Sequence, residues 1–80
     1  MSKQSKQILL RLGDSIRVRR GKLGLSQERL AERAGLDRTY ISMLERGVRN
    51  PSLLNLQRLA KGLDLSISDL TKGCDGTRPD

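Results

Sequence analysis

The chain has 80 residues, of which 16 are lysine or arginine and 9 are aspartate or glutamate, so its formal net charge is +7 at pH 7. This length allows one small domain, and the charge favours a polyanionic partner such as DNA, RNA or an acidic membrane surface. Because there is no histidine and only one cysteine, an intramolecular disulfide is impossible and a metal site of the usual nitrogen and sulfur ligands is excluded. We also expect no cofactor.

The composition predicts an aliphatic core and an all-helical fold. Tyr40 is the only aromatic residue. Val, Ile and Thr never alternate with polar residues over a stretch long enough for a half-buried strand. No apolar run approaches the length of a membrane span, and Arg11 interrupts the short run of residues 8–10, which argues against a signal peptide. We therefore expect a cytoplasmic protein that does not enter a membrane.

The first predicted helix begins at about Ile8. Residues 1–7 are polar and have no apolar face, so we expect them to form a flexible start. The buried side of the helix is an apolar stripe at helical spacing: Leu9, Leu12 and Ile16. Gly21 and Gly24 mark its end.

Two short helices joined by a tight turn are predicted between Ser26 and Gly47. The Ser26 hydroxyl can accept a hydrogen bond from a free backbone N–H of the first helix, and Gly35 is a typical stop signal. Asp37 can cap the second helix in the same way. The inward positions of this second helix are Ile41 and Leu44.

The outward face of this second helix has the chemistry to contact DNA bases. At about 100° per residue, the helical period points four side chains away from the core: Thr39, Ser42, Met43 and Arg46. Arg38 and Tyr40 flank this face. A short helix of this kind, carried on a tight turn, fits the DNA major groove. The same spacing also occurs in a two-helix hairpin inside an ordinary helical bundle, so the spacing alone leaves both interpretations open.

Two more helices are predicted after the motif. Ser52 is the expected N-cap of the first, and its buried stripe is Leu53, Leu56, Ala60 and Leu63, with Leu59 beside it. Ser66 and Asp69 form a capping-box pattern that predicts a short last helix. Residues 73–80 are polar and contain glycine and proline, so we expect them to be disordered, with Cys74 as an exposed thiol.

One small monomer has difficulty burying three apolar residues of the C-terminal part: Leu54, Leu65 and Ile67. They are candidates for a dimer seam. The alternative is that one or two of them are simply exposed, as apolar residues often are.

The segment from Ser26 to Gly47 resembles the helix-turn-helix of Cro/repressor-type regulators. Five residues stand at the first, fifth, ninth, fifteenth and eighteenth places of that motif: Gln27, Ala31, Gly35, Ile41 and Leu44. The similarity extends over roughly residues 8–72. Within the family, residues 36–42 and 45–51 resemble the controller proteins of restriction-modification systems. This resemblance implies a compact, five-helix, lambda-repressor-like DNA-binding domain at residues 8–72.

The resemblance also implies how such a protein works. Family members bind near-palindromic double-stranded DNA as homodimers, and a dimer beside a promoter can block RNA polymerase or help recruit it. The resemblance implies that Arg20 and Glu45 form an internal salt bridge, so we assign both residues to structure.

Individual contacts follow from the chemistry of the side chains. Arg38 can donate two parallel hydrogen bonds to guanine O6 and N7, and Thr39 can meet a thymine methyl group or a base edge. The other candidates for base contact are Tyr40, Ser42 and Met43. Contacts to the DNA backbone need only well-placed donors. The candidates for these are Gln27, Arg46, Arg49 and Asn50.

The main alternative is a protein-interaction module, such as an antitoxin or a coactivator domain, that uses the same fold. An enzyme is not expected. The chain lacks histidine and its carboxylates occupy capping or salt-bridge positions, so no nucleophile–base pair or acid–base dyad can be assembled.

Overall fold

Helices make up all the regular structure in residues 2–75, the part of the chain that this computed structural model describes. In chain order they are α1 (Lys3–Lys22), α2 (Gln27–Ala34), α3 (Arg38–Glu45), α4 (Leu53–Gly62) and α5 (Ile67–Leu70), followed by a 3-10 turn, η1 (Lys72–Cys74). The predicted all-helical fold of five α-helices is confirmed. Within the described residues, no helix is both long enough and apolar enough to cross a membrane.

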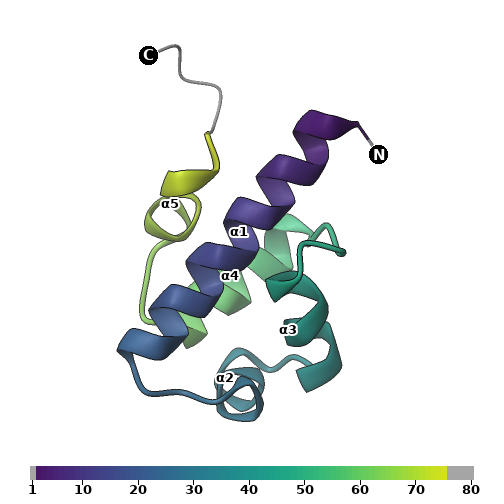
Figure 1. Cartoon of the computed structure of the whole chain (residues 1–80). Coiled ribbons are helices and arrows are strands. Elements are labelled where there is room, and N and C mark those ends of the chain that lie inside the picture. The colour runs from purple at the N-terminus through teal and green to yellow at the C-terminus, as the bar shows by residue number, and fades with distance from the viewer. Residues whose placement is uncertain (1, 76–80) are drawn as a thin grey trace.

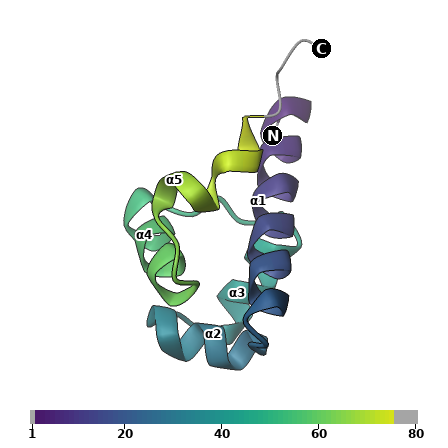
Figure 2. The same cartoon turned by 90° about the vertical axis from the view of Figure 1, so that its left-hand side faces the viewer.

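The other helices are arranged around α1, which runs diagonally across the molecule in Figure 1. α3 and the turn after it lie on the side of the N-terminus, whereas α5 lies on the opposite side. α2 contacts both α3 and α4, and α4 contacts α5. In the view of Figure 2, α4 and α5 lie on one side, α1 on the other, and α2 closes one end of the molecule.

Buried aliphatic side chains from all five helices form one core. They are Leu12, Ile16, Leu30, Ala31, Ile41, Leu44, Leu59, Ala60, Leu63 and Leu70. Burial of each large side chain stabilises the fold by roughly 1.5 to 3 kcal/mol relative to its exposure to water. Because α3 contributes Ile41 and Leu44 to this cluster, the opposite face of α3 is left toward solvent.

The predicted N-caps are present at the four helices after α1. In each, the side-chain oxygen of the cap accepts a hydrogen bond from a backbone N–H of the first turn. The pairs are Ser26 with Arg29, Asp37 with Thr39, Ser52 with Asn55 and Ser66 with Asp69. Local side chains therefore determine where these helices begin.

α1 begins earlier than the sequence predicts. We expected a flexible start at residues 1–7, but the structure places Lys3–Lys22 in the helix. The Ser2 hydroxyl accepts a hydrogen bond from the Ser5 N–H at 3.1 Å and so caps the first turn. Once the buried turns exist, each further residue adds one hydrogen bond for one ordered residue, so a helix extends readily through polar sequence. Met1 lies outside the described residues.

The predicted buried stripe of α4 is wrong at its first residue. Leu53 is 70% exposed. The close contact of α4 with α2 lies at its other end, where a Cβ atom on Gly62 would be 3.2 Å from the Cβ atom of Ala34. Leu53, the first residue of α4, lies outside this contact and is left uncovered.

The C-terminal segment is more ordered than expected over its first residues. We predicted disorder for residues 73–80, but η1 reaches Cys74 and packs against α1. The Cys74 thiol, which we expected to be exposed, is half-buried against the core. Burial raises the pKa of this thiol, and the charge of Asp75 raises it further. Residues 76–80 lie outside the described residues.

Candidate nucleic-acid interface

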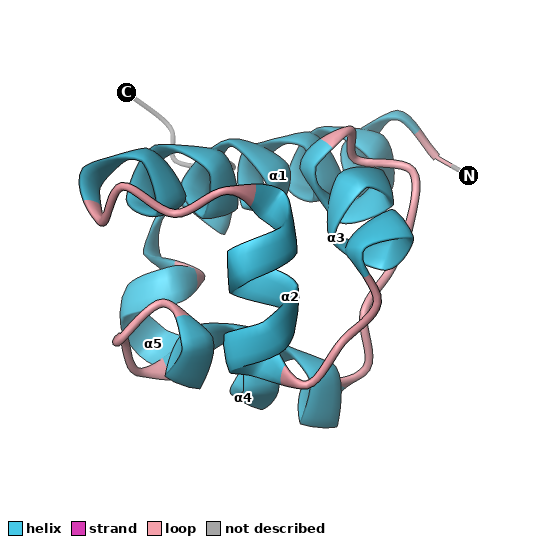
Figure 3. Ribbon diagram, turned by 90° about the horizontal axis from the view of Figure 1, so that it is seen from below, coloured by secondary structure: helices cyan, strands magenta, loops and turns pink. Residues whose placement is uncertain are grey.

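A tight turn carries the chain from α2 into α3, and Figure 3 shows the two helices from below. Gly35 ends α2 with a positive φ of 68°, a conformation in which a Cβ atom is strained. The Leu36 N–H donates to the Ala31 carbonyl at 2.9 Å and so closes the helix end. Asp37 then caps α3 directly. Gly35 and Asp37 thus limit the connection to three residues between the helices.

A buried cluster of polar side chains fixes the C-terminal end of α3. Arg20 of α1 donates to both oxygens of Glu45, from Nε at 2.7 Å and from Nη2 at 3.0 Å. Its Nη1 donates to the Leu25 carbonyl at 2.9 Å. The Glu45 side chain is only 6% exposed, and its hydrogen bonds raise the pKa of Arg20 above the usual value. The ion pair that the resemblance implied is therefore present.

Gln27 is part of the same cluster. Its Nε2 donates to Glu45 Oε1 at 3.1 Å, and its side chain is half-buried. One of the two N–H groups of this amide is thus engaged inside the protein, and the expected contact of Gln27 with a DNA phosphate stays a prediction. Since Gln27 begins α2 and Glu45 ends α3, this hydrogen bond holds the two helices of the motif together. We call this cluster the Gln27–Glu45–Arg20 clamp.

The face of α3 opposite the core exposes some of the predicted base-contact residues and partly covers the others. Arg38 and Thr39, at the start of the helix, are exposed, and so is Arg46 just after its end. Ser42 and Met43 are half-buried. The only acidic side chain of α3 is Glu45, which is buried and paired, so the exposed groups of the helix are cationic or neutral.

Arg38 has one acidic neighbour on the preceding helix. Its Nε lies 3.9 Å from Glu28 Oε1, and the two side chains are 59% and 79% exposed. An ion pair this long and this exposed contributes little to stability. Arg38 can therefore leave it for a base or a phosphate at little cost.

The turn between α3 and α4 contributes a second set of donors. Arg49 and Asn50 are both exposed. The Arg49 guanidinium lies over the ring of Tyr40, with its carbon 5.1 Å from the ring centroid. Tyr40 is half-buried, and its hydroxyl oxygen accepts a hydrogen bond from Asn55 Nδ2 of α4 at 3.1 Å. Tyr40 thus links the helix, the turn and α4, which its sequence position alone does not indicate.

A second candidate surface lies where α4 meets α5. The three predicted seam residues differ in exposure: Leu54 is 54% exposed, while Leu65 and Ile67 are half-buried against the core. Leu54 and Ile67 line one groove together with Leu53 and Gln57. The sequence did not predict that Leu53 belongs to this surface, because its spacing from Leu56 and Ala60 matches a buried stripe.

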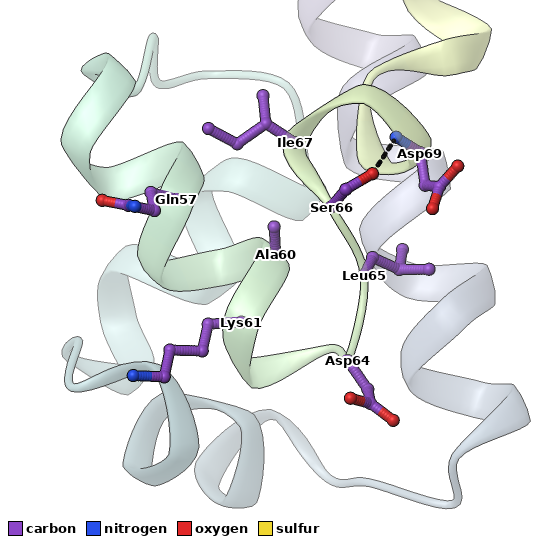
Figure 4. Close-up of a pocket in the computed structure, with 8 residues that line it drawn as sticks. All are labelled: Gln57, Ala60, Lys61, Asp64, Leu65, Ser66, Ile67 and Asp69. Carbon is purple, nitrogen blue, oxygen red and sulfur yellow. Dashed lines mark hydrogen bonds between the residues drawn. The ribbon is translucent and has the colours of Figure 1, made fainter.

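A larger hollow of about 580 Å³ continues this groove along the two helices. Figure 4 shows its lining, which includes Gln57 and Lys61 of α4 on one side and Leu65 and Ile67 on the other. Asp64 and Asp69 place carboxylates at its rim. The hollow is open and shares Gln57 and Ile67 with the smaller groove, so the two form one continuous depression beside the exposed leucines.

Known proteins resemble this chain in both sequence and structure. A family model described as Helix-turn-helix matches residues 16–70. Control protein C.MunI of Mycoplasma sp is 44% identical over 64 residues, which cover 79% of this chain and 86% of that protein. Control protein C.BamHI of Bacillus amyloliquefaciens is 45% identical over 64 residues, covering 79% of each chain. The crystal structure of the restriction-modification controller protein C.AhdI from Aeromonas hydrophila matches with a TM-score of 0.76 and 47% identity, covering 78% of this chain and 94% of that one.

Proposed function

The chain belongs to the Cro/C1-type helix-turn-helix family, and we propose that it is a sequence-specific DNA-binding transcriptional regulator that binds a near-palindromic operator as a homodimer. The controller proteins among its relatives support a role at the operon of a restriction-modification system. These relatives are regulators, and no enzymatic activity is part of the proposal.

The observation that carries this proposal is the exposed, cationic side of α3 on a rigid support. Arg38 and Arg46 stand at the two ends of the helix, and no free carboxylate of α3 lies between them. The Gln27–Glu45–Arg20 clamp ties this helix to α1 and α2. A helix held in this way can enter the major groove without reorganising the domain.

Base recognition is assigned to the start of α3. Arg38 is proposed to donate to guanine O6 and N7, and Thr39 to contact a thymine methyl group or a base edge. Tyr40, Ser42 and Met43 are partly covered, so their contacts require bases that approach closely.

Contact with the DNA backbone is assigned to the ends of the motif helices and the turn after α3. Arg46, Arg49 and Asn50 are exposed donors on this side. Gln27 is proposed to contribute through the backbone N–H groups at the start of α2 and through the amide N–H that does not donate to Glu45. Each phosphate contact by a cationic side chain should add roughly 0.9 to the magnitude of the slope of the logarithm of the binding constant against the logarithm of the salt concentration.

The depression beside Leu53 and Leu54 is proposed as the dimer seam, together with Leu65 and Ile67. In a two-fold dimer the same surface of each protomer meets its counterpart, so exposed leucines on one subunit can enter the depression of the other. Dimerisation would place the two α3 helices about 34 Å apart, one turn of the DNA helix. The operator should therefore be a near-palindrome with half-sites separated by that distance.

Selection of binding sites from a pool of random duplexes tests the proposal. We expect enrichment of a near-palindrome that is bound far more tightly than scrambled DNA at two salt concentrations. Enrichment of no sequence, with only uniform and salt-sensitive binding, would instead indicate a protein-interaction module on the same fold. Transcription from a template that carries the selected site would then show whether the dimer blocks RNA polymerase or recruits it.

A further inference from the structure

We propose that Asn55 of α4 is a positioning residue for DNA binding, which holds Tyr40 and, through it, Arg49 in the orientation that contacts DNA. The inference rests on the proposed function, because it concerns how the DNA-facing side chains are arranged. Asn55 itself belongs to a different helix from the motif and is half-buried. Its effect on DNA would therefore be exerted through Tyr40.

The backbone and the side chain of Asn55 are both held in place. Its backbone N–H donates to the Ser52 hydroxyl at 3.1 Å, which is the N-cap hydrogen bond of α4. Its Nδ2 donates to the Tyr40 hydroxyl oxygen at 3.1 Å, and its Oδ1 accepts from Arg58 Nη1 at 3.4 Å. The amide thus has a donor partner on one side and an acceptor partner on the other, which defines its orientation.

This hydrogen bond gives the Tyr40 hydroxyl a direction. Because the phenol oxygen accepts from Asn55, the hydroxyl hydrogen remains available to donate elsewhere. A donor at this place can meet a phosphate oxygen, a purine N7, guanine O6 or thymine O4, but not the amino group of adenine or cytosine. Asn55 therefore favours acceptor atoms as the partners of the Tyr40 hydroxyl.

The ring of Tyr40 in turn supports Arg49. The guanidinium carbon lies 5.1 Å from the ring centroid, which is cation–π geometry. A long, exposed arginine side chain has many rotamers, and contact with a ring restricts them before DNA arrives. Less conformational entropy is then lost when Arg49 binds a phosphate. Moving the ring should therefore weaken the backbone contact as well.

A double-mutant cycle on operator DNA tests this chain of contacts. The variants are Asn55→Ala, Tyr40→Phe and the two combined, with affinities measured on the operator and on scrambled duplex. We expect each single change to weaken operator binding about threefold to tenfold, as for the loss of one neutral hydrogen bond. The affinity of the combined variant for the operator should lie within about twofold of that of the weaker-binding single variant, because both changes break the same contact.

Gln7→Ala is the matched control, since it removes an exposed amide of α1 to which no DNA contact is assigned. Thermal unfolding and sedimentation should show the same fold and dimer for all four variants. Tyr40 is the only aromatic residue, so its fluorescence reports the contact in the absence of DNA. Iodide should quench it more strongly in Asn55→Ala than in the wild type or in Gln7→Ala.

Three results would overturn the inference. Operator binding by Asn55→Ala at wild-type affinity would show that Asn55 positions nothing. Fully additive losses in the double variant would show that Asn55 and Tyr40 act separately. A wild-type protein without sequence preference would overturn the proposed function as well, and this outcome is distinguishable because it appears before any variant is compared.

Discussion

At the scale of single residues, Glu45 shows how one carboxylate connects three helices. It accepts three hydrogen bonds from side chains of α1 and α2 while it ends α3. In the interior, a carboxylate and a guanidinium are tolerated only because each satisfies the other. Removal of one partner leaves a buried charge without compensation.

Glu45→Ala is accordingly expected to lower the free energy of unfolding by roughly 3 to 5 kcal/mol. Urea denaturation followed by circular dichroism measures this loss. Asp14→Ala is the control, because it removes an ion pair with Arg17 whose side chains are 62% and 54% exposed. Its effect should stay below about 1 kcal/mol. Equal losses in the two variants would mean that the clamp contributes no more than a surface pair.

Arg38 and Arg49 are both exposed arginines near the same helix, but they should have different effects on binding. Arg38→Ala should cost about 1 to 3 kcal/mol of binding free energy on the operator and little on scrambled DNA, because it removes a base contact. Arg49→Ala should weaken binding to all sequences alike and lower the salt slope by roughly 0.9. Titrations of both variants on both duplexes at several salt concentrations separate the two roles. The assignment fails if both variants lose the same affinity on the operator and on scrambled DNA.

At the scale of elements, the packing of α3 against α1 depends on one glycine. Gly13 is buried in the middle of α1, and a Cβ atom there would lie 2.5 Å from the Glu45 carbonyl oxygen and 2.7 Å from that of Leu44. Both are backbone atoms at the end of α3, so they cannot rotate away. The close approach of the two helices therefore requires a residue without a side chain.

Two glycine substitutions in α1 should have opposite effects. Gly13→Ala should destabilise the protein by about 1 to 3 kcal/mol despite the better helix propensity of alanine, because the extra atom overpacks the contact. Gly21→Ala lies in the same helix with nothing within 4 Å of the added atom. It should stabilise the protein by roughly 0.5 to 1 kcal/mol. Thermal unfolding of both variants measures these changes in stability. A Gly13→Ala protein at least as stable as the wild type would contradict the packing argument.

At the scale of the whole molecule, the proposed DNA-facing side and the proposed dimer seam share the helix α4 and are otherwise built on different elements. α3 and the turn after it form the DNA-facing side, and the first turns of α4 and α5 form the seam. The helix α4 takes part in both, since Leu53 and Leu54 lie next to Asn55 in its first turn. The proposed dimer seam and the contact that is proposed to arrange the DNA-facing side chains thus lie in a single turn of helix.

Leu54→Asp should convert the dimer to monomers in sedimentation experiments. The substitution places a charge in the seam, yet leaves the fold intact because Leu54 is 54% exposed. Val48→Asp is a matched control, since Val48 is also 54% exposed but lies in the turn after α3. It should leave the dimer unchanged. A Leu54→Asp protein that still sediments as a dimer would require a different interface.

The sequence by itself determined the local features. The N-caps at Ser26, Asp37, Ser52 and Ser66 and the stop at Gly35 act within one helical turn, so residue type and spacing were sufficient to predict them. Family membership was also evident, because the motif positions are close together in the chain. The predicted beginning of α1 at about Ile8 was wrong, because extension of a helix through polar residues depends on the buried turns that follow them.

Only the tertiary structure decided which side chains are exposed and which are already engaged. Leu53 has the spacing of a core residue, but its side chain is 70% exposed. Gln27 has the position of a phosphate contact, and one N–H of its amide also donates to Glu45, which is 18 residues away in the chain. The contact of Asn55 with Tyr40 likewise spans 15 residues. Such contacts depend on how the helices pack, and a local sequence pattern carries no information about distances between distant residues.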